Sequence, residues 1–213
     1  MTAASWTFAV VTVACALTDW WATYAERPSV RHVSKPATLA ALIGVAVTVD
    51  PSVPPAIRTW MVIGLVLSLA GDVFLMLDEK WFLAGLGSFL LGHLAYVVGL
   101  QLAPTSMAFT LVGLAVVAAT MGTAGRQVIR RVGRAQRDLL LPVVVYAAVI
   151  SAMVVSAFGT AAPWAVIGAG LFYVSDATLA WNRFLERRRW GPLVVMVTYH
   201  LGQFGLVAWL FTG

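Results

Sequence analysis

Long apolar runs recur along the whole chain, and they restrict what it can fold into. Each is close to the roughly 17 to 25 residues that a helix needs to cross the hydrocarbon core of a bilayer. Of the 213 residues, 61% are hydrophobic and only 11% are charged, whereas about a quarter of the residues in a soluble domain are charged. The sequence therefore predicts an integral membrane protein.

The runs are predicted to be helices, because a helix satisfies its own backbone hydrogen bonds in lipid and the runs lack the polar alternation of barrel strands. We expect eight transmembrane helices in an all-α bundle. Their predicted ranges are Ala4–Tyr24, Lys35–Val49, Arg58–Leu77, Trp81–Leu102, Thr105–Ala124, Leu139–Phe158, Trp164–Trp181 and Pro192–Phe211. The connections are short, so residues 1–213 are predicted to form a single transmembrane domain. Asp78, Glu79 and Lys80 make one tight link, which predicts an antiparallel hairpin of the third and fourth spans.

The basic residues lie almost entirely on one side of these spans. If the first connection is cytoplasmic, thirteen of the fourteen Lys and Arg residues are cytoplasmic and only Arg58 lies outside. This positive-inside pattern predicts that both termini are non-cytoplasmic in a multi-pass protein of the cell membrane. It also explains the net charge of +5 as a topology signal, so no nucleic-acid partner is expected. Cys15 is the one cysteine, which excludes an intramolecular disulfide.

Five ionisable side chains fall inside the predicted spans, where a charge costs about 2.5 to 3.5 kcal/mol on insertion scales. They are Asp19, Asp72, His93, Asp176 and His200. The three acids each lie six residues from the cytoplasmic end of a span, roughly 9 Å deep at the helical rise. We expect one polar cavity that opens toward the cytoplasmic leaflet. Asp72 and Asp176 favour a functional role, while Asp19 and His200 fit structural roles at least as well.

Two short similarities indicate a four-plus-four internal repeat. Gly71-Asp72-Val-Phe-Leu75 in span three matches Ser175-Asp176-Ala-Thr-Leu179 in span seven, and His93-Leu-Ala-Tyr96 in span four matches His200-Leu-Gly-Gln203 in span eight. Spans three and seven run in the same direction, so the two halves would be related by an axis along the membrane normal.

The same residues resemble a known family. Gly71-Asp72 followed by Phe82, Phe89, His93 and Tyr96, the run Gly168-Ala-Gly-Leu-Phe-Tyr-Val-Ser-Asp-Ala-Thr-Leu-Ala-Trp-Asn182, Lys35-Pro36, and Tyr199 with Gln203 are similar to motifs of the YhhN-like lysoplasmalogenases, eight-span membrane proteins. The resemblance covers essentially the whole chain and departs at His200 and Gly202. It implies hydrolysis of the vinyl ether bond of lysoplasmalogen to a fatty aldehyde and glycerophospho-ethanolamine or -choline, with no cofactor.

This reaction needs an acid and a base. Burial disfavours the charged form of a carboxyl group, so one of two nearby acids can hold its proton while the other is ionised. Asp72 and Asp176 are predicted to form this pair, with His93 orienting or re-protonating a carboxyl group. Ser34 is predicted to cap a helix that starts at Lys35, which would place the Lys35 ammonium and the helix N-terminus at the lipid phosphate. The predicted substrate-binding residues are Lys35, Tyr96, Tyr146, Ser175, Asn182, Tyr199 and Gln203.

Two other classes of function fit part of the pattern. A metal-dependent lipid hydrolase could use His93, His200, Asp72 and Asp176, although they lack the close helical pairing of a zinc motif. A proton-coupled transporter of a small molecule or lipid would also bury acids and histidines. It needs polar residues toward both faces, and these thin out toward the outer side. Membrane lipids are the expected surroundings, and the sequence predicts no oligomeric state.

Overall fold

The computed structural model describes residues 2–212, and within that range the chain forms nine α-helices and no strand. Their bounds are α1 Ala3–Tyr24, α2 Pro28–Thr48, α3 Pro55–Met76, α4 Phe82–Gln101, α5 Met107–Thr120, α6 Arg126–Ala135, α7 Leu140–Gly159, α8 Pro163–Phe184 and α9 Gly191–Thr212. The predicted all-α class is confirmed.

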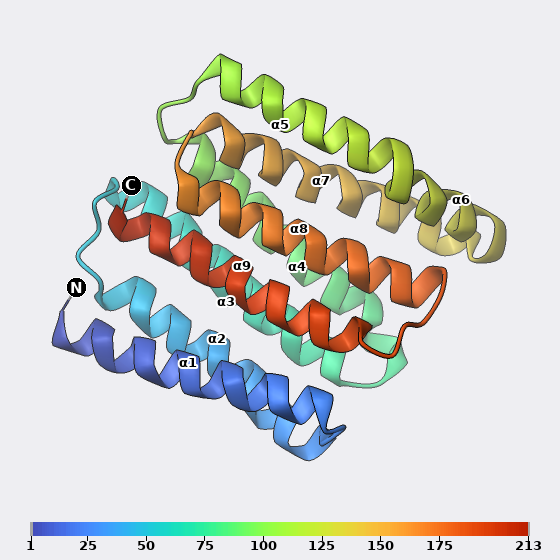
Figure 1. Ribbon diagram of the computed structural model, residues 1–213, viewed down its shortest axis with the longest axis horizontal. Coiled ribbons are helices and arrows are strands. Elements are labelled where there is room, and N and C mark those ends of the chain that lie inside the picture. The colour runs from blue at the N-terminus through green and yellow to red at the C-terminus, as the bar shows by residue number, and fades with distance from the viewer. Residues whose placement is uncertain (1, 213) are drawn as a thin grey trace.

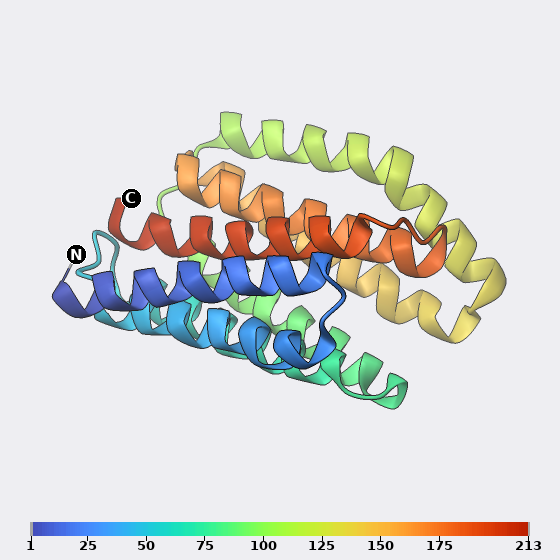
Figure 2. The same ribbon diagram turned by 60° about the horizontal axis from the view of Figure 1, so that its bottom comes forward.

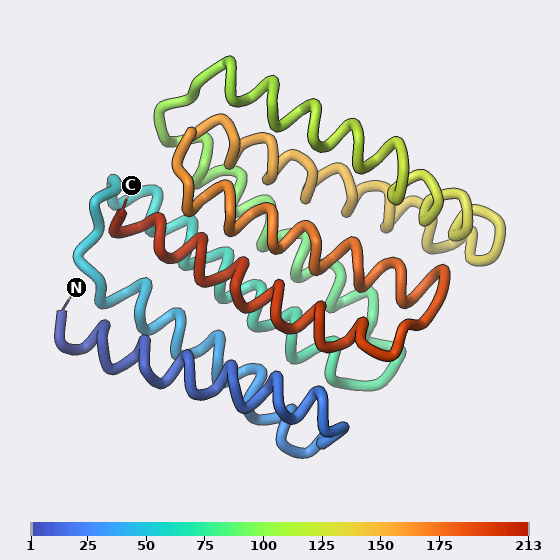
Figure 3. Tube along the Cα trace, viewed as in Figure 1, coloured from blue at the N-terminus to red at the C-terminus, as the bar shows by residue number. Residues whose placement is uncertain are grey.

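The long helices form one bundle in which sequential helices run in alternate directions (Figures 1 and 3). The two ends of the chain lie at the same end of this bundle. The most extensive packing joins α8 to α9, α3 to α4 and α1 to α2. The predicted hairpin of the third and fourth spans is therefore confirmed as α3 and α4, which a short 3₁₀ turn at Glu79–Trp81 connects.

Seven helical segments within residues 2–212 are long and apolar enough to cross a membrane. They contain α1, α3, α4, α5 with α6, α7, α8 and α9. Helix α2 has 21 residues and lies against α1 and α3, but it is not among the seven. The chain is thus a multi-pass helical membrane protein.

Helix α2 begins earlier than the sequence predicts. It starts at Pro28, where a proline suits the first turn, so Lys35 lies two turns inside the helix and Pro36 is an interior proline. Ser34 does not cap the helix, because its hydroxyl group donates to the Val30 carbonyl at 3.0 Å. The expectation that Lys35 stands at a helix N-terminus is therefore wrong.

Helices α5 and α6 form one continuous helical rod that bends near their junction and projects beyond the bundle at the end opposite the termini (Figure 2). A π-helical segment, Met121–Gly125, joins them without a break. Gly113 is the one buried residue of α5, so this helix lies at the periphery of the bundle. Val128 and Val132 of α6 are buried with Val143 of α7, while the arginines of α6 are exposed.

Glycine allows α8 and α9 to approach closely. A Cβ atom on Gly168 would lie 2.6 Å from the Leu206 backbone nitrogen, and one on Gly202 would lie 2.8 Å from the Phe172 nitrogen. Close contact of this kind is how helices pack in lipid, where the hydrophobic effect does not drive association. Not every glycine serves it: a Cβ atom on Gly87 or Gly170 would meet open space.

Candidate active site

A cavity of about 660 Å³ lies at the end of the bundle away from the termini. Its wall contains residues of α2, α3, α4, α7, α8 and α9, and the α5–α6 rod forms one side. Both predicted catalytic acids, Asp72 and Asp176, line it. Lys35, Tyr146, Ser175, Asn182 and Tyr199 line it as well. Seven of the predicted site residues thus lie around one cavity.

Asp72 is held by two partners from other helices. Its Oδ1 atom lies 2.9 Å from Lys35 Nζ on α2, and Tyr199 of α9 donates a hydrogen bond of 2.8 Å to Oδ2. The Lys35 and Asp72 side chains are 8% and 1% exposed. This carboxyl group is thus placed beside a buried positive charge.

Asp176 of α8 has different surroundings. Tyr146 of α7 donates a hydrogen bond of 2.5 Å to its Oδ2 atom. His93 Nε2 of α4 lies 3.7 Å from the same oxygen, and no Lys or Arg side chain of residues 2–212 is paired with it. The side chain is 14% exposed, so it is the more accessible of the two acids.

A contact of the other ring nitrogen of His93, Nδ1, shows which nitrogen carries the proton. Nδ1 lies 2.6 Å from the Phe89 carbonyl oxygen, which can only accept a hydrogen bond, so Nδ1 must carry a proton. In the neutral ring Nε2 is then an acceptor, and it points toward Asp176. The ring is fully packed, with the Phe172 ring centroid 4.6 Å away and that of Tyr146 5.3 Å away.

Two of the predicted substrate-binding residues lie behind the wall. Tyr96 donates a hydrogen bond of 2.6 Å to Gln203 Oε1, both side chains are fully buried, and neither lines the cavity. Their bond joins α4 to α9. The sequence predicts the depth of Tyr96 and Gln203, but it does not show whether they line the cavity or lie behind the residues that line it.

Ser175 and Asn182 line the cavity but have clear structural partners. Ser175 Oγ donates to the Val195 carbonyl at 3.0 Å and so ties α8 to α9. Asn182 Oδ1 accepts a hydrogen bond of 3.2 Å from the Arg188 backbone nitrogen in the α8–α9 connection. Both residues therefore shape the wall by fixing the helix that carries Asp176.

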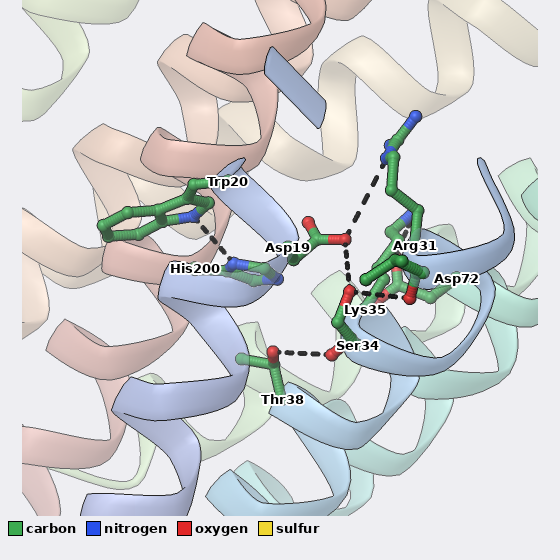
Figure 4. Close-up of polar contacts among 9 residues, drawn as sticks. Asp19, Trp20, Arg31, Ser34, Lys35, Thr38, Asp72 and His200 are labelled. Carbon is green, nitrogen blue, oxygen red and sulfur yellow. Dashed lines mark hydrogen bonds and ion pairs between the residues drawn. The ribbon is translucent and has the colours of Figure 1, made fainter. Parts of the chain in front are cut away.

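A further buried acid, Asp19, lies beside α2. Asp19 of α1 is fully buried, and its Oδ1 atom lies 3.2 Å from Ser34 Oγ and 3.9 Å from Arg31 Nε (Figure 4). His200 is also fully buried, and its Nδ1 accepts a hydrogen bond of 3.0 Å from Trp20 Nε1. In the sequence, Asp19 and Asp72 lie at the same predicted depth, which is the one indication that Asp19 is close to the site.

The arrangement of possible metal ligands bears on the metal-hydrolase alternative. Within the described range, no three His, Cys, Asp or Glu side chains come together in a group that could hold a metal ion. His200 faces Trp20 on α1 and does not line the cavity. The predicted catalytic residue His93 does not line it either, because its buried ring lies behind Asp176.

Comparisons with known proteins agree with the motifs. The YhhN family model matches residues 30–210. The chain is 31% identical over 186 residues to the lysoplasmalogenase of Mycobacterium bovis (strain ATCC BAA-935 / AF2122/97), covering 83% of this chain and 69% of that protein. It is 29% identical over 161 residues to the mouse lysoplasmalogenase TMEM86B, covering 72% and 65%, and 32% identical over 141 residues to the human one, covering 65% and 58%. No solved structure matches the chain significantly.

Proposed function

The chain belongs to the YhhN family, and on that premise we propose that it is a membrane lysoplasmalogenase. It would hydrolyse the vinyl ether bond of a lysoplasmalogen, releasing a fatty aldehyde and a glycerophospho-ethanolamine or -choline. The substrate is a lysophospholipid, which the cavity would take up from the surrounding lipid. No cofactor enters the proposal.

One observation carries the chemical part of this proposal. Two carboxyl groups from separate helices line the same cavity, and they have opposite kinds of partner. Asp72 lies beside the Lys35 ammonium, whereas Asp176 lies beside a tyrosine hydroxyl and the acceptor nitrogen of His93. An acid and a base can therefore coexist at one site.

We assign the base to Asp72 and the acid to Asp176. An ammonium at 2.9 Å stabilises the ionised carboxylate of Asp72. A carboxylate at Asp176 would have no buried cation to offset the loss of water, so the protonated form is favoured there. The Nε2 lone pair of His93 would then face a carboxylic acid and orient it, which makes His93 a positioning residue.

The reaction would begin with proton transfer from Asp176 to the alkene carbon that does not carry the ether oxygen. The carbon–carbon double bond is lost, and the neighbouring carbon and the ether oxygen share the positive charge of an oxocarbenium ion. The Asp72 carboxylate, facing the same cavity, stabilises this cation as carboxylates do in glycoside hydrolysis. A water molecule adds to the cationic carbon and gives its proton to Asp72.

The resulting hemiacetal then collapses. Its hydroxyl group gives its proton to the Asp176 carboxylate, the bond from that carbon to the glycerol oxygen breaks, and Asp72 returns its proton to the glycerol oxygen. One water molecule is consumed, and both aspartates regain their starting states. The assignment of acid and base therefore closes the cycle without another proton donor.

The same proposal includes the finer topology. Helix α2 would be the eighth span, packed between α1 and α3, and both termini would be non-cytoplasmic. The cavity would then open toward the cytoplasmic leaflet, because it lies at the end of the bundle where the basic connections gather. The four-plus-four repeat stays part of this proposal as well: α3–α4 and α8–α9 are the two hairpins that carry the matching motifs.

Purified protein in detergent tests the function directly. We expect aldehyde release from lysoplasmalogen and none from the saturated alkyl ether analogue, since carbon protonation requires the double bond. In D₂O the aldehyde should carry one deuterium on the carbon next to the carbonyl group. In H₂¹⁸O the glycerol product should stay unlabelled, because the bond that breaks lies between the glycerol oxygen and the former vinyl carbon.

Two results would contradict the proposal. Equal turnover of the saturated ether would exclude alkene protonation as the first step. Substrate movement across proteoliposomes without any aldehyde would instead favour the transporter.

A further inference from the structure

Two cations on one face of α2 line the cavity at different depths. Lys35 and Arg31 are four residues apart, so they lie one helical turn from each other on the same side of the helix. The helical rise separates them by about 6 Å along the axis. Lys35 is at the level of Asp72, and Arg31 is nearer the α1–α2 connection and the end of the bundle.

Arg31 forms an ion pair with the buried acid Asp19. The Arg31 Nε atom is buried, makes no hydrogen bond within residues 2–212 and lies 3.9 Å from Asp19 Oδ1, an ion-pair distance. The same oxygen is 3.2 Å from Ser34 Oγ. Asp19 is fully buried, whereas 34% of the Arg31 side chain is exposed. In Figure 4 the far end of the Arg31 guanidinium group extends away from this cluster. A guanidinium group whose Nε faces a carboxylate keeps its two terminal amino groups for another acceptor.

The other cations of the cavity wall are already engaged. Lys35 pairs with Asp72, and Arg183 pairs with Glu79 and lies over the Phe82 ring. Arg188 belongs to the exposed α8–α9 connection, with its guanidinium carbon 5.4 Å from the ring centroids of Trp181 and Trp190. Arg31 differs from Arg188 because it forms an ion pair with a buried carboxylate, that of Asp19.

We propose that Arg31 binds the phosphate group of the lysophospholipid and that Asp19 is the positioning residue that aims it. This inference rests on the proposed function, because it uses the dimensions of that substrate. In a lysoplasmalogen the vinyl ether and the phosphate are attached to opposite ends of a three-carbon glycerol. With the vinyl ether at Asp72, the phosphate lies about one helical turn away, which is the position of Arg31. Arginine suits it because two of its N–H groups match two phosphate oxygens.

The test compares two substrates that differ only in the phosphate. One is lysoplasmalogen and the other is the corresponding alkenylglycerol, which keeps the vinyl ether and has no headgroup. For Arg31→Gln we expect KM for lysoplasmalogen to rise about 10- to 100-fold, the effect of a lost charged hydrogen bond. We expect kcat to stay within about 2-fold and alkenylglycerol hydrolysis to be unchanged. Arg31→Lys should fall between the two, since it keeps the charge and loses the paired donors.

Two control variants locate the effect. Arg134→Gln removes an exposed arginine of α6 and should leave KM for both substrates unchanged. Arg188→Gln changes another cation of the cavity wall, and its effect on KM for lysoplasmalogen should be smaller than that of Arg31→Gln. A loss of lysoplasmalogen affinity in Arg188→Gln, with Arg31→Gln unaffected, would overturn the proposal and move the phosphate to the α8–α9 connection. An equal change toward both substrates in Arg31→Gln would also overturn it.

Asp19→Asn tests the positioning role. We expect a rise in KM for lysoplasmalogen smaller than that of Arg31→Gln and no change for alkenylglycerol. A merely structural role would instead lower kcat for both substrates together with the melting temperature, and that result would overturn the assignment of Asp19.

A binding measurement separates this inference from the proposed function. The saturated alkyl ether lysophospholipid cannot be cleaved, so its Kd can be measured by calorimetry without turnover. If the wild-type protein cleaves neither vinyl ether but binds this lipid, and Arg31→Gln weakens the binding, the phosphate site stands and the hydrolase fails. If both vinyl ethers are cleaved and Arg31→Gln binds as the wild type does, the hydrolase stands and the phosphate site fails.

Discussion

Lys35 Nζ lies 2.9 Å from Asp72 Oδ1, and the pair joins α2 to α3 in the interior of the bundle. Removing one member of a buried ion pair leaves an uncompensated charge, whereas replacing both members is far less costly. We therefore expect Lys35→Met and Asp72→Asn each to lower the free energy of unfolding by about 3 kcal/mol, the lower end of the range for buried pairs. Thermal unfolding in detergent measures this.

The double variant Lys35→Met/Asp72→Asn supplies the control for that pair. It should regain most of the lost melting temperature and still release no aldehyde, because the proposed base is gone. A double variant as unstable as the sum of the single variants would show that the two side chains act independently.

Asp176→Asn should separate chemistry from folding. The amide oxygen that the substitution introduces can still accept the hydrogen bond from Tyr146, so the melting temperature should change little. Loss of the proposed proton donor should lower kcat/KM at least about 100-fold, as for other general acids. Asp50→Asn, a change at an exposed position, is the matched control and should keep full activity. Full aldehyde release by Asp176→Asn would contradict the assigned acid.

His93→Gln tests the positioning of Asp176. The amide of glutamine can donate to the Phe89 carbonyl, but it does not reproduce the ring nitrogen that faces Asp176. We expect kcat to fall about 10-fold, below the roughly 100-fold or greater effect of losing the acid itself, with KM nearly unchanged. Steady-state kinetics on lysoplasmalogen decide the point, and a rise in KM at constant kcat would place His93 in substrate binding instead.

The α8–α9 contact predicts opposite results at two neighbouring glycines. Gly168→Ala would place a Cβ atom 2.6 Å from the Leu206 nitrogen, so the helices must separate, at a cost of about 1 to 3 kcal/mol. Gly170→Ala meets open space and should leave the melting temperature unchanged or slightly raised. Equal melting temperatures for the two variants would be inconsistent with the close packing.

The proposed orientation can be checked with a single-cysteine series. Cys15→Ser removes the one native thiol, and Ser52→Cys or Arg134→Cys then introduces a thiol at an exposed position at either end of the bundle. An impermeant maleimide added to intact cells should label the Ser52→Cys protein and should label the Arg134→Cys protein only after permeabilisation. The reverse pattern would invert the topology.

Most of the fold could be predicted because each span is marked by its own composition. The ends of α1, α3, α4, α7, α8 and α9 lie within three residues of the predicted ends. Helix α2 could not be bounded in this way, because charged residues occupy its first two turns and Pro36 resembles a helix start. What keeps those turns helical is packing against α1 and α3, which is a tertiary effect.

The sequence predicts how deep each polar side chain of the site lies, but it does not predict which neighbour the side chain faces. Helical rise placed Asp19, Asp72 and Asp176 in one layer, and the two proposed catalytic acids do face one cavity. Rise alone does not give the rotation of a helix relative to its neighbours. That is why Tyr96 and Gln203 proved to face each other behind the wall, and why the partners of Asp19 could not be foreseen.

The ion pair between α2 and α3 also bears on how such a chain is made. Composition alone does not qualify α2 as a membrane span, and the acid that neutralises Lys35 is translated only with α3. A lone lysine entering the bilayer from the translocon costs about 2.5 to 3.5 kcal/mol. In the proposed eight-span topology, stable integration of α2 would therefore wait for α3, and the first three helices would enter the bilayer in concert.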